Sequence, residues 1–581
     1  MPMRLAVLFG VVGLAHAVPN GLGMTPPLAW SSWNYFAFGI NETIALEIGD
    51  ALIETGLHKL GYEYVNIDAG SFEGTRDPTT GKIVAVASKY PHGIRWLADQ
   101  LHAKGLKLGV YTDISLHTCG GSGSMGHYQI DAETYAYDWE VDYLKVDYCG
   151  PTSGSTNITT GRVSYQPGPQ YDAWMALGLA LNATGRPIYY SICPHRPVAA
   201  SDGLPPEWTG GLAYAPPPEW SAAQRKQLAN SILVEYTNTF DAWYIPPGQH
   251  GHGGIITDID SMVQLTELEY SGPGSWNDAD MLQLCTYGKG NTIHSATGMT
   301  LSEYRAHYSV WAVLASPLIL SADLRTIKQE HPDCLELMLN AEIVGVNQDP
   351  LGLPGRFISQ KTNRSSYGSG LDLAPCAAAP TLPGAAWVAE ADGSIRVDNG
   401  ATTLCLDAYN CNVADGTPVG LYACHPNGTA ECGYKNQQWR QGDGTITNAN
   451  SQTCLTVNGS STELRHCVGG DPTQALTLSG GLLKVGTTGQ CLFPQQVAGP
   501  ADITSQIFAR SLQNGATAVV LLNRDETAAE LSVSWAELGL PGGTSMAVRD
   551  VINGKDLPHA TDSWSGTVGK HDVAFIRLSP V

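Results

Sequence analysis

The sequence predicts a multidomain protein: a (β/α)8 TIM barrel followed by an antiparallel β-sandwich, with a β-trefoil module inserted or attached. Three patterns indicate this. Short apolar runs alternate with amphipathic helical stretches from Trp30 to about Leu324, which is typical of a parallel barrel. Cysteine-rich repeats follow between about residues 376 and 495. From Ile507 onward, apolar and polar residues alternate as in the strands of a sandwich.

Composition excludes several classes of protein. The chain has 581 residues, of which 43% are hydrophobic and 15% charged, so it is neither a disordered protein nor a coiled coil. Its formal net charge is -22, without any run of Lys or Arg. A chain this acidic repels phosphate backbones and anionic lipids, so we expect no nucleic-acid partner and no membrane partner.

The N-terminus has the features of a secretory signal peptide over residues 1–17. Arg4 supplies the positive charge, Leu5–Leu14 is apolar, and Ala15-His16-Ala17 is a small-residue cleavage site. The apolar run is too short to cross the roughly 30 Å hydrocarbon core of a bilayer. We therefore expect a secreted, extracellular glycoprotein with disulfides, in which the odd number of cysteines, 13, leaves at least one thiol over or paired outside the chain. Glycosylation sequons begin at Asn41, Asn157, Asn182, Asn363, Asn427 and Asn458.

Within the barrel, assigned to residues 18–350, helical patterns such as Ile44–Leu57 and Ile94–Leu106 separate short buried strands. The strands are expected at Tyr64–Asp68, Leu106–Tyr111, Tyr143–Asp147 and Ile188–Ile192. Three carboxylates, Asp68, Asp113 and Asp147, fall at the carboxyl ends of such strands. In a barrel these ends meet at one mouth, so we expect the carboxylates to converge there.

The cysteine-rich module, assigned to residues 376–499, contains a threefold repeat. Its copies are Cys405-Leu406-Asp407, Cys454-Leu455-Thr456 and the degenerate Cys491-Leu492-Phe493. Repeats of about 40 residues, each a small disulfide-closed β unit, favour a β-trefoil.

The sandwich is assigned to residues 351–375 and 500–581, with strands at Ala518–Leu522 and Val573–Leu578. If Arg356–Ser359 is its first strand, the cysteine-rich module is inserted into the sandwich.

Asp147 is the strongest catalytic candidate. Lys145 lies one pleat below it on the same strand and would keep the carboxylate ionised. An ionised carboxylate in a sheltered mouth can attack a glycosidic carbon, which points to an oligosaccharide or polysaccharide substrate. The alternative is a purely structural Lys145–Asp147 salt bridge. Flat apolar faces on which sugars stack are offered by Trp30, Trp33, Tyr111 and Trp276, and further polar groups by Asp68 and Asn277–Met281.

No metal or cofactor site is predicted. His250 and His252 lie in a Gly-rich loop and are expected to be solvated. No phosphate-binding glycine motif follows a strand.

Six segments carry a family resemblance: Thr25–Asn34, Tyr64–Asp68, Lys107–Tyr111, Tyr143–Asp147, Gly272–Met281 and Val346–Leu351. In this order they resemble the melibiase-type α-galactosidases of glycoside hydrolase family 27, over roughly Asn20 to Leu351. The resemblance implies that Asp147 is the nucleophile and that a Cys119–Cys149 disulfide lies beside it. It also implies a sugar pocket made by Trp33 on the C6 side, Lys145 and Tyr111 in the lining, and Asp68 and Asp280 on the hydroxyls.

The chain departs from the family pattern at the pocket. Members usually carry two successive aspartates and a cysteine after the second strand, where this chain has Asp68-Ala69-Gly70. Phe38 stands where the partner cysteine is expected, and Cys193-Pro194-His195 replaces the family's Cys-Glu-Trp. Together these changes predict a reshaped sugar pocket.

The family's acid/base ends the sixth strand, which we place at Ser231–Thr239. Its position then falls on Thr237 or Asn238, neither of which can donate a proton as a carboxylic acid does. Three carboxylates are rival replacements: Asp241, Glu235 and Asp258. Asp241 ranks first because it follows the strand, whereas Asp258 is expected on a helix flank.

The cysteine-rich module resembles the ricin-B-type lectins. The resemblance implies that Cys405–Cys424 and Cys454–Cys467 close the first two lobes. Gln437-x-Trp439 matches the lobe-closing motif, and Asp407 stands where the fold often binds a sugar. Because one lobe has the complete motif, both a second glycan site and a purely structural module stay open.

The sequence thus predicts a secreted retaining exo-glycosidase that removes terminal α-D-galactosyl residues through a covalent intermediate on Asp147. Two alternatives stay open. One is a β-L-arabinopyranosidase on the same scaffold, and the other is a catalytically weak carbohydrate-binding protein.

Overall fold

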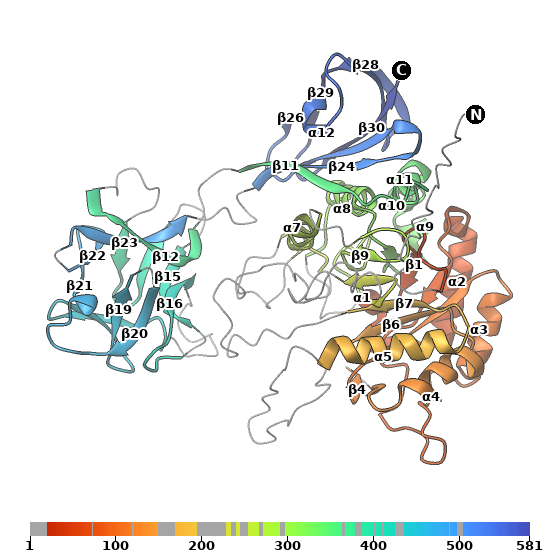
Figure 1. Ribbon diagram of the computed structural model, residues 1–581, viewed down its shortest axis with the longest axis horizontal. Coiled ribbons are helices and arrows are strands. Elements are labelled where there is room, and N and C mark those ends of the chain that lie inside the picture. Colours follow the sequence, from red (N-terminus) through yellow and green to blue (C-terminus); the bar gives the residue numbers. More distant parts are fainter. Residues whose placement is uncertain are drawn as a thin grey trace, which may run out of the picture.

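The computed structural model contains three bodies, a barrel, a sandwich and a trefoil (Figure 1). It describes residues 20–72, 74–118, 121–148, 169–193, 228–233, 240–244, 254–266, 271–290, 297–362, 367–377, 386–398, 403–409, 412–424, 435–459, 461–486, 488–496 and 503–581. The expected signal peptide and the expected Cys119–Cys149 disulfide lie outside these ranges. Among the helices described, none has the length and apolar character needed to span a bilayer.

Eight parallel strands form the barrel sheet in the order β10-β1-β2-β3-β6-β7-β8-β9. They are β1 Leu28–Ser31, β2 Tyr64–Asn66, β3 Lys107–Asp113, β6 Tyr143–Asp147, β7 Tyr189–Ile192, β8 Ser231–Leu233, β9 Trp276–Asp278 and β10 Leu318–Leu320. A parallel bridge between Leu282 and Leu320 closes the ring, with a 2.7 Å hydrogen bond from the Leu282 N–H to the Ile319 carbonyl. The predicted barrel is confirmed.

Helices cover the outside of this sheet. They are α2 Glu42–Thr55, α3 Ile94–His102, α4 Tyr128–Glu133, α5 Pro169–Ala183, α7 Ile255–Leu265, α8 Leu301–Leu314, α9 Ile327–Glu330, α10 Pro332–Met338 and α11 Ala341–Asn347. Helix α2 begins where the Asn41 side chain accepts the Ile44 N–H, and it ends at Gly56, whose φ of 87° suits glycine. Helix α3 ends at His102, four residues before the predicted boundary at Leu106.

Aromatic rings fill the lower half of the barrel. Tyr143 and Tyr189 stack with their centroids 4.9 Å apart, and Tyr64 packs edge-on against Tyr143 at 5.5 Å. All three are buried. These rings fill the amino end of the barrel. The polar residues that follow the strands line the opposite end, because the carboxyl ends of parallel strands meet there.

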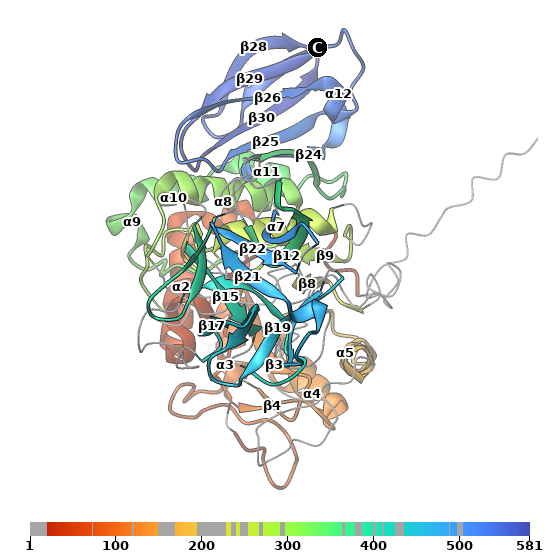
Figure 2. The same ribbon diagram turned by 90° about the vertical axis from the view of Figure 1, so that its left-hand side faces the viewer.

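The C-terminal body is a β-sandwich that lies over α8 and α11 (Figure 2). One sheet has the order β11-β24-β25-β30-β27-β28 and the other pairs β26 with β29. The strands are β11 Arg356–Thr362, β24 Ile503–Ser511, β25 Thr517–Asn523, β26 Ala529–Ser534, β27 Ser545–Asp550, β28 Lys555–Thr561, β29 Ser563–Val568 and β30 Val573–Pro580. The expected first strand at Arg356–Ser359 is confirmed by the pairing of β11 with β24. The chain between these two neighbours forms the trefoil.

The trefoil consists of three four-stranded sheets around one apolar core. Its strands are β12 Tyr367–Pro375, β13 Trp387–Ala389, β14 Ile395–Asp398, β15 Thr403–Ala408, β16 Val419–Ala423, β17 Trp439–Gly442, β18 Thr445–Asn448, β19 Thr453–Asn458, β20 Ser461–His466, β21 Leu476–Ser479, β22 Leu482–Val485 and β23 Gln490–Gln496. The expected disulfides Cys405–Cys424 and Cys454–Cys467 are confirmed. Two further disulfides were not predicted: Cys376–Cys491 joins the two ends of the module, and Cys285–Cys334 lies in the barrel.

Candidate active site

Inward-facing polar residues of β2, β3 and β6 meet at the carboxyl end of the barrel. Strand register sets their levels, because Tyr111 pairs with Lys145 and Asp113 with Asp147. Side chains alternate along a strand, so Lys145 and Asp147 both face inward. Asp113 is fully buried and accepts hydrogen bonds from the N–H and hydroxyl of Ser115, which ties down the loop after β3.

Asp147 is held at both carboxylate oxygens. The Tyr111 hydroxyl donates to Oδ2 at 2.8 Å, and the Tyr148 backbone N–H donates to Oδ1 at 2.8 Å. Burial, together with the nearby carboxylates of Asp147 and Asp113, raises the pKa of Tyr111 well above its ordinary value. The phenol therefore keeps its proton and continues to donate to Asp147. Asp147 is buried, with 7% of its surface exposed.

Lys145 forms its salt bridge with Asp68. The ammonium Nζ lies 2.9 Å from Asp68 Oδ2, and both side chains are largely buried. The alternative prediction of a structural Lys145–Asp147 salt bridge is therefore wrong, because the partner of Lys145 is Asp68. Burial lowers the pKa of Lys145, but the charges of Asp68 and Asp147 outweigh this effect and raise it above its usual range. Lys145 is a fixed cation among carboxylates.

A small cavity of about 20 Å³ extends from this group into the barrel. Its polar lining comes from Ser31, Asn66, Asp68, Lys145, Ser191, Asp278 and Asp280. Asp278 is the last residue of β9, Asp280 lies two residues later in the turn, and both are buried. Burial and the charge of Asp280 raise the pKa of Asp278 to about 8. The family resemblance gives a sugar-binding role to Asp280 alone, and Asp278 was expected only as part of the polar segment Asn277–Met281, although their spacing of two residues favours the same inward face for both.

Of the four aromatic residues expected to offer flat faces, two belong to the core. Trp30 is fully buried and donates its indole N–H to the Ala322 carbonyl. Trp276 is also buried and donates to the Gly23 carbonyl. Trp33 and Tyr111 are also buried, in a second apolar cluster that contains Ala69 and the barrel tyrosines Tyr64, Tyr143 and Tyr189.

The remodelled segment after β2 has an apolar face. Ala69, in the place of the family's second aspartate, is 2% exposed and packs in the same cluster as Trp33. Phe38 meets the Trp33 ring edge-on at 5.2 Å. The loss of a carboxylate here is therefore matched by apolar neighbours.

The acid/base candidates are dispersed. Asp241 is fully buried, its carboxylate accepts hydrogen bonds from the Gly288 N–H and the Tyr304 hydroxyl, and burial raises its pKa. This engagement removes the reason for ranking Asp241 first, since the side chain is not open to the mouth. Asp258 is 1% exposed on helix α7, as expected for a helical residue. Glu235, Thr237 and Asn238 lie outside the described residues.

One group of metal-ligating side chains occurs in the described part of the chain. Asp99, His102 and Glu140 bring one ligand atom each within 4.8 Å of one another. Arg95 already forms ion pairs with Asp99 at 2.9 Å and Glu140 at 3.0 Å. The guanidinium thus supplies the positive charge at this place. His250 and His252 fall outside the described ranges.

The first trefoil lobe contains a buried polar group. Asp407 Oδ2 accepts hydrogen bonds from Asn436 Nδ2 at 2.8 Å and Gln437 Nε2 at 2.7 Å. Trp439 is buried in the module core and donates to the Leu406 carbonyl. Burial raises the pKa of Asp407 to about 7, against the two amide donors.

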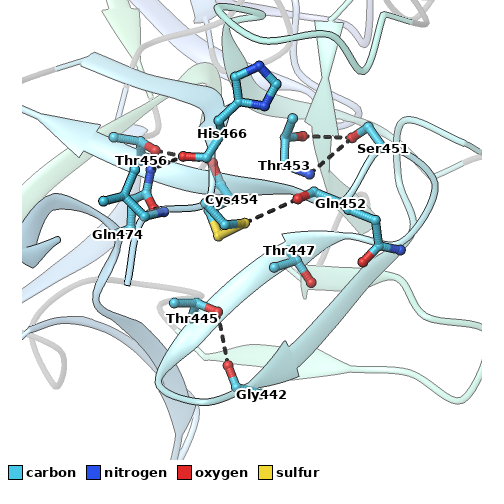
Figure 3. The surroundings of a disulfide bond; sticks show 12 residues. Gly442, Thr445, Thr447, Ser451, Gln452, Thr453, Cys454, Thr456, His466 and Gln474 are labelled. Carbon is cyan, nitrogen blue, oxygen red and sulfur yellow. Dashed lines mark hydrogen bonds between the residues drawn. A yellow bond between two sulfur atoms is a disulfide. The ribbon is translucent and has the colours of Figure 1, made fainter. Parts of the chain in front are cut away.

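The second lobe lacks this arrangement (Figure 3). Thr456 takes the place of Asp407 in the repeat, and its hydroxyl donates to the Cys454 carbonyl at 3.1 Å. Gln474 donates to the His466 carbonyl at 2.8 Å. Both side chains therefore hydrogen-bond to backbone carbonyls of their own lobe. In the third copy of the repeat, the apolar Phe493 stands at the position of Asp407.

Family models match each of the three bodies. The Alpha galactosidase A model matches residues 25–201 and 218–349, and the Alpha galactosidase C-terminal beta sandwich domain matches residues 502–578. The Ricin-type beta-trefoil lectin domain matches residues 353–475 and 393–515.

Among curated proteins, an α-galactosidase from Cyamopsis tetragonoloba is 38% identical over 345 residues, covering 59% of this chain and 69% of its own. An α-N-acetylgalactosaminidase from Rattus norvegicus is 33% identical, covering 62% of this chain and 76% of its own.

Solved structures share the fold. α-Galactosidase I from Mortierella vinacea superposes with a TM-score of 0.61 at 23% identity, covering 97% of this chain and 99% of its own. A β-L-arabinopyranosidase from Geobacillus stearothermophilus gives a TM-score of 0.55 at 16% identity, covering 97% and 100%. The chain is an O-glycosyl hydrolase of the multidomain barrel, sandwich and trefoil architecture, and it belongs to the melibiase-type α-galactosidase family, glycoside hydrolase family 27.

Proposed function

We propose that the protein is a secreted retaining exo-glycosidase that hydrolyses terminal α-D-galactosyl residues. The observation that carries the proposal is Asp147, an inward carboxylate at the end of β6 oriented by the Tyr111 hydroxyl at 2.8 Å. The 38% identity of the chain to the α-galactosidase from Cyamopsis tetragonoloba supports the choice of sugar.

In the proposed reaction Asp147 attacks the anomeric carbon and the glycosidic bond breaks. The glycosyl-enzyme ester formed is then hydrolysed by water, with retention of configuration. The hydrogen bonds from Tyr111 and Tyr148 hold the carboxylate in one orientation for attack. The Lys145–Asp68 pair and Asp280 bind hydroxyl groups of the sugar, with Trp33 against its C6 side.

A carboxylic acid must protonate the leaving oxygen, and it lies roughly 5–5.5 Å from the nucleophile in retaining enzymes. The acid stays open among the rivals Asp241, Asp258 and Glu235, because burial alone does not exclude the first two when Asp147 is itself buried. No step is assigned to Asp241, whose carboxylate is bound by Gly288 and Tyr304.

Release of 4-nitrophenol from aryl glycosides tests the proposal. We expect turnover of the α-D-galactopyranoside by the wild type, loss of at least about a thousandfold in Asp147→Asn, and α-galactose as the first anomer seen by proton NMR. Asp392→Asn, in the trefoil, is the matched control. Full activity of Asp147→Asn, or β-galactose as the first anomer, contradicts the proposal.

Ala69 favours one second candidate, a β-L-arabinopyranosidase. This sugar matches galactose without the C6 group, and the segment where a second carboxylate is usual is here an apolar cluster of Ala69 and Trp33. A kcat/KM for the aryl β-L-arabinopyranoside above that for the α-galactoside would select it.

The catalytically weak carbohydrate-binding protein rests on the unassigned acid. It predicts turnover of well-activated aryl leaving groups and none of an unactivated disaccharide, with Glu235→Gln unchanged. For the trefoil, we propose a glycan site in the first lobe alone, where Asp407 is held by Asn436 and Gln437.

A further inference from the structure

The turn after β9 places Asp280 in an unusual backbone conformation. Its φ of 77° lies in the left-handed region, which non-glycine residues rarely occupy without support. Asp278 gives that support, because its Oδ1 accepts the Asp280 N–H at 3.0 Å. The Asp280 carbonyl is held in turn by the Trp311 indole N–H at 2.8 Å.

The other carboxylate oxygen of Asp278 faces no hydrogen-bond partner. Oδ2 is inaccessible to solvent, as are Ser31 Oγ and Asn66 Oδ1, and none of the three has a partner in the structure. All three residues line the same cavity, which lies within the barrel. Buried polar atoms are rarely left unsatisfied, but the one donor among these three atoms, the Ser31 hydroxyl, can satisfy only one of the two remaining acceptors, so a second donor is needed. A carboxylic acid has one, whereas a carboxylate has none.

The charges of the cavity lead to the same conclusion. Asp68, Asp278 and Asp280 line it with a single cation, Lys145, which already pairs with Asp68 at 2.9 Å. A charge on Asp278 would therefore be buried beside Asp280 without compensation, which is costly. Burial and the charge of Asp280 accordingly raise the pKa of Asp278 to about 8. The titratable groups that face Asp278 are Asp280, Lys145 and the phenols of Tyr143 and Tyr189.

We propose that Asp278 is a positioning residue that works as a neutral carboxylic acid. Its Oδ1 holds Asp280 in the left-handed turn, and its Oδ2 hydroxyl donates to Asn66 Oδ1 or Ser31 Oγ, directly or through one water, in addition to the one proton that the Ser31 hydroxyl can donate. The inference rests on the proposed function, since Asp280 is there a ligand of the sugar. Asp278 itself does not touch the substrate.

Two variants separate charge from geometry. Asp278→Asn keeps the acceptor for Asp280 and a neutral donor at the second position, so we expect its kcat/KM at pH 6 to stay within about threefold of the wild type. Asp278→Ala loses the support of the turn, and we expect KM to rise and kcat/KM to fall about tenfold or more. Asp392→Ala is the control, because Asp392 also accepts the N–H two residues on, from Ser394, but in the trefoil.

The pH profile gives a readout that a merely structural role would not move. Above pH 8 the wild type ionises Asp278, so the ratio of kcat/KM between Asp278→Asn and wild type should rise about tenfold from pH 7 to 9. Stability supplies an arm independent of activity. The folded state holds this proton up to about pH 8 and the unfolded state only to about 3.8, so the wild-type Tm should fall relative to Asp278→Asn between these values and stay parallel above them.

The outcomes are distinguishable. Asp278→Asn that folds but is inactive at pH 6, or pH profiles and Tm differences that do not change with pH, would overturn the inference. If the wild type cleaves none of the glycosides, the proposed function fails. In that event the Tm comparison still decides whether Asp278 carries the proton.

Discussion

Phe38 packs directly on the backbone of Gly70. A Cβ placed on Gly70 would lie 2.5 Å from Phe38 Cδ1 and 3.3 Å from Phe38 Cβ. The Lys89 ammonium donates to both carbonyls, at 2.5 Å to Phe38 and 2.7 Å to Gly70. Two loops at the barrel mouth are thus joined by packing and a shared cation where the family resemblance leads one to expect a disulfide.

This contact predicts that the double variant Phe38→Cys/Gly70→Cys forms a disulfide. Cβ atoms of bonded cysteines lie about 3.5–4.5 Å apart, so little movement is needed. Closing a loop of this length is worth about 3.7 kcal/mol, and a non-glycine residue at the Gly70 φ of 82° costs about 1–2 kcal/mol. We expect a net gain of about 2 kcal/mol in unfolding free energy, measured by denaturant titration. The single variants are controls, and free thiols in the oxidised double variant would contradict the geometry.

The Lys145–Asp68 pair predicts an asymmetry between single and double variants. Lys145→Met leaves the Asp68 carboxylate, 4% exposed in its side chain, without its cation, and we expect a loss of about 3–5 kcal/mol in stability. Lys145→Met/Asp68→Asn removes both charges and should regain most of it. Denaturant titrations of the wild type, Lys145→Met, Asp68→Asn and the double variant give the coupling energy between the two side chains. Additive losses would show that Asp68 is not the ammonium's main partner. Lys145→Met and the double variant should both be inactive, because Lys145 and Asp68 are proposed to bind the sugar.

The hydrogen bond between Tyr111 and Asp147 predicts a kinetic effect. Tyr111→Phe removes a donor to a carboxylate, an interaction worth about 1.5–3 kcal/mol. We expect kcat to fall at least about tenfold with a smaller change in KM, measured on the aryl galactoside. Tyr135→Phe is the control, since Tyr135 is equally buried and its hydroxyl has no hydrogen-bond partner in the structure. Equal effects of the two substitutions would assign Tyr111 a structural role alone.

Periodicity and strand-end placement carried the sequence-based prediction far. The strands bearing Asp68, Tyr111 and Asp147 are recognisable because buried parallel strands read as short apolar runs, and their carboxyl ends must meet. The proximity of Tyr111 to Asp147 follows from those ends. The cysteine repeats similarly predict the trefoil, and the resemblance to the ricin-B-type lectins implies two of its disulfides.

Periodicity does not specify which face of a strand a side chain occupies or which residue it contacts. In a strand buried on both sides, an aromatic such as Trp30 is equally compatible with the core and with the pocket. Lys145 is long enough to reach either carboxylate, so its pairing with Asp68 depends on the barrel's closure. Asp241 was expected at the mouth, but its carboxylate is bound by Tyr304, 63 residues later in the chain.

The trefoil group predicts a pH-dependent lectin activity. Asp407 has a pKa raised by burial to about 7, and its carboxylate form accepts hydrogen bonds from sugar hydroxyls better than its acid form. We expect retention of Asp147→Asn protein on immobilised galactose to fall as the pH drops from about 8 to 5. Asp407→Ala should lose the pH-dependent part of this retention and keep only what the barrel site contributes, whereas Thr456→Ala, in the second lobe, should behave as the parent. Retention that ignores Asp407 would place the glycan elsewhere.

The insertion point of the trefoil predicts that the module is dispensable for folding. Thr362 at the end of β11 and Ile503 at the start of β24 are register partners in one antiparallel pair, so the chain leaves and re-enters the sandwich on adjacent strands. Replacing residues 363–502 by Asn-Gly would turn β11 and β24 into a hairpin with a two-residue loop. The module's own core and the Cys376–Cys491 disulfide are removed with it as a unit.

We expect this shortened protein to unfold cooperatively, with a Tm within about 5 °C of the parent, since its sandwich and barrel keep their cores. Its kcat/KM for the small aryl galactoside should stay within about twofold, because no proposed site residue is lost. Its retention on immobilised galactose should lose the pH-dependent part that the trefoil contributes, as in Asp407→Ala. Loss of the aryl activity with a native Tm would mean that the trefoil contributes to the barrel site itself, and a collapse of the Tm would mean that β11 and β24 need the insertion to pair.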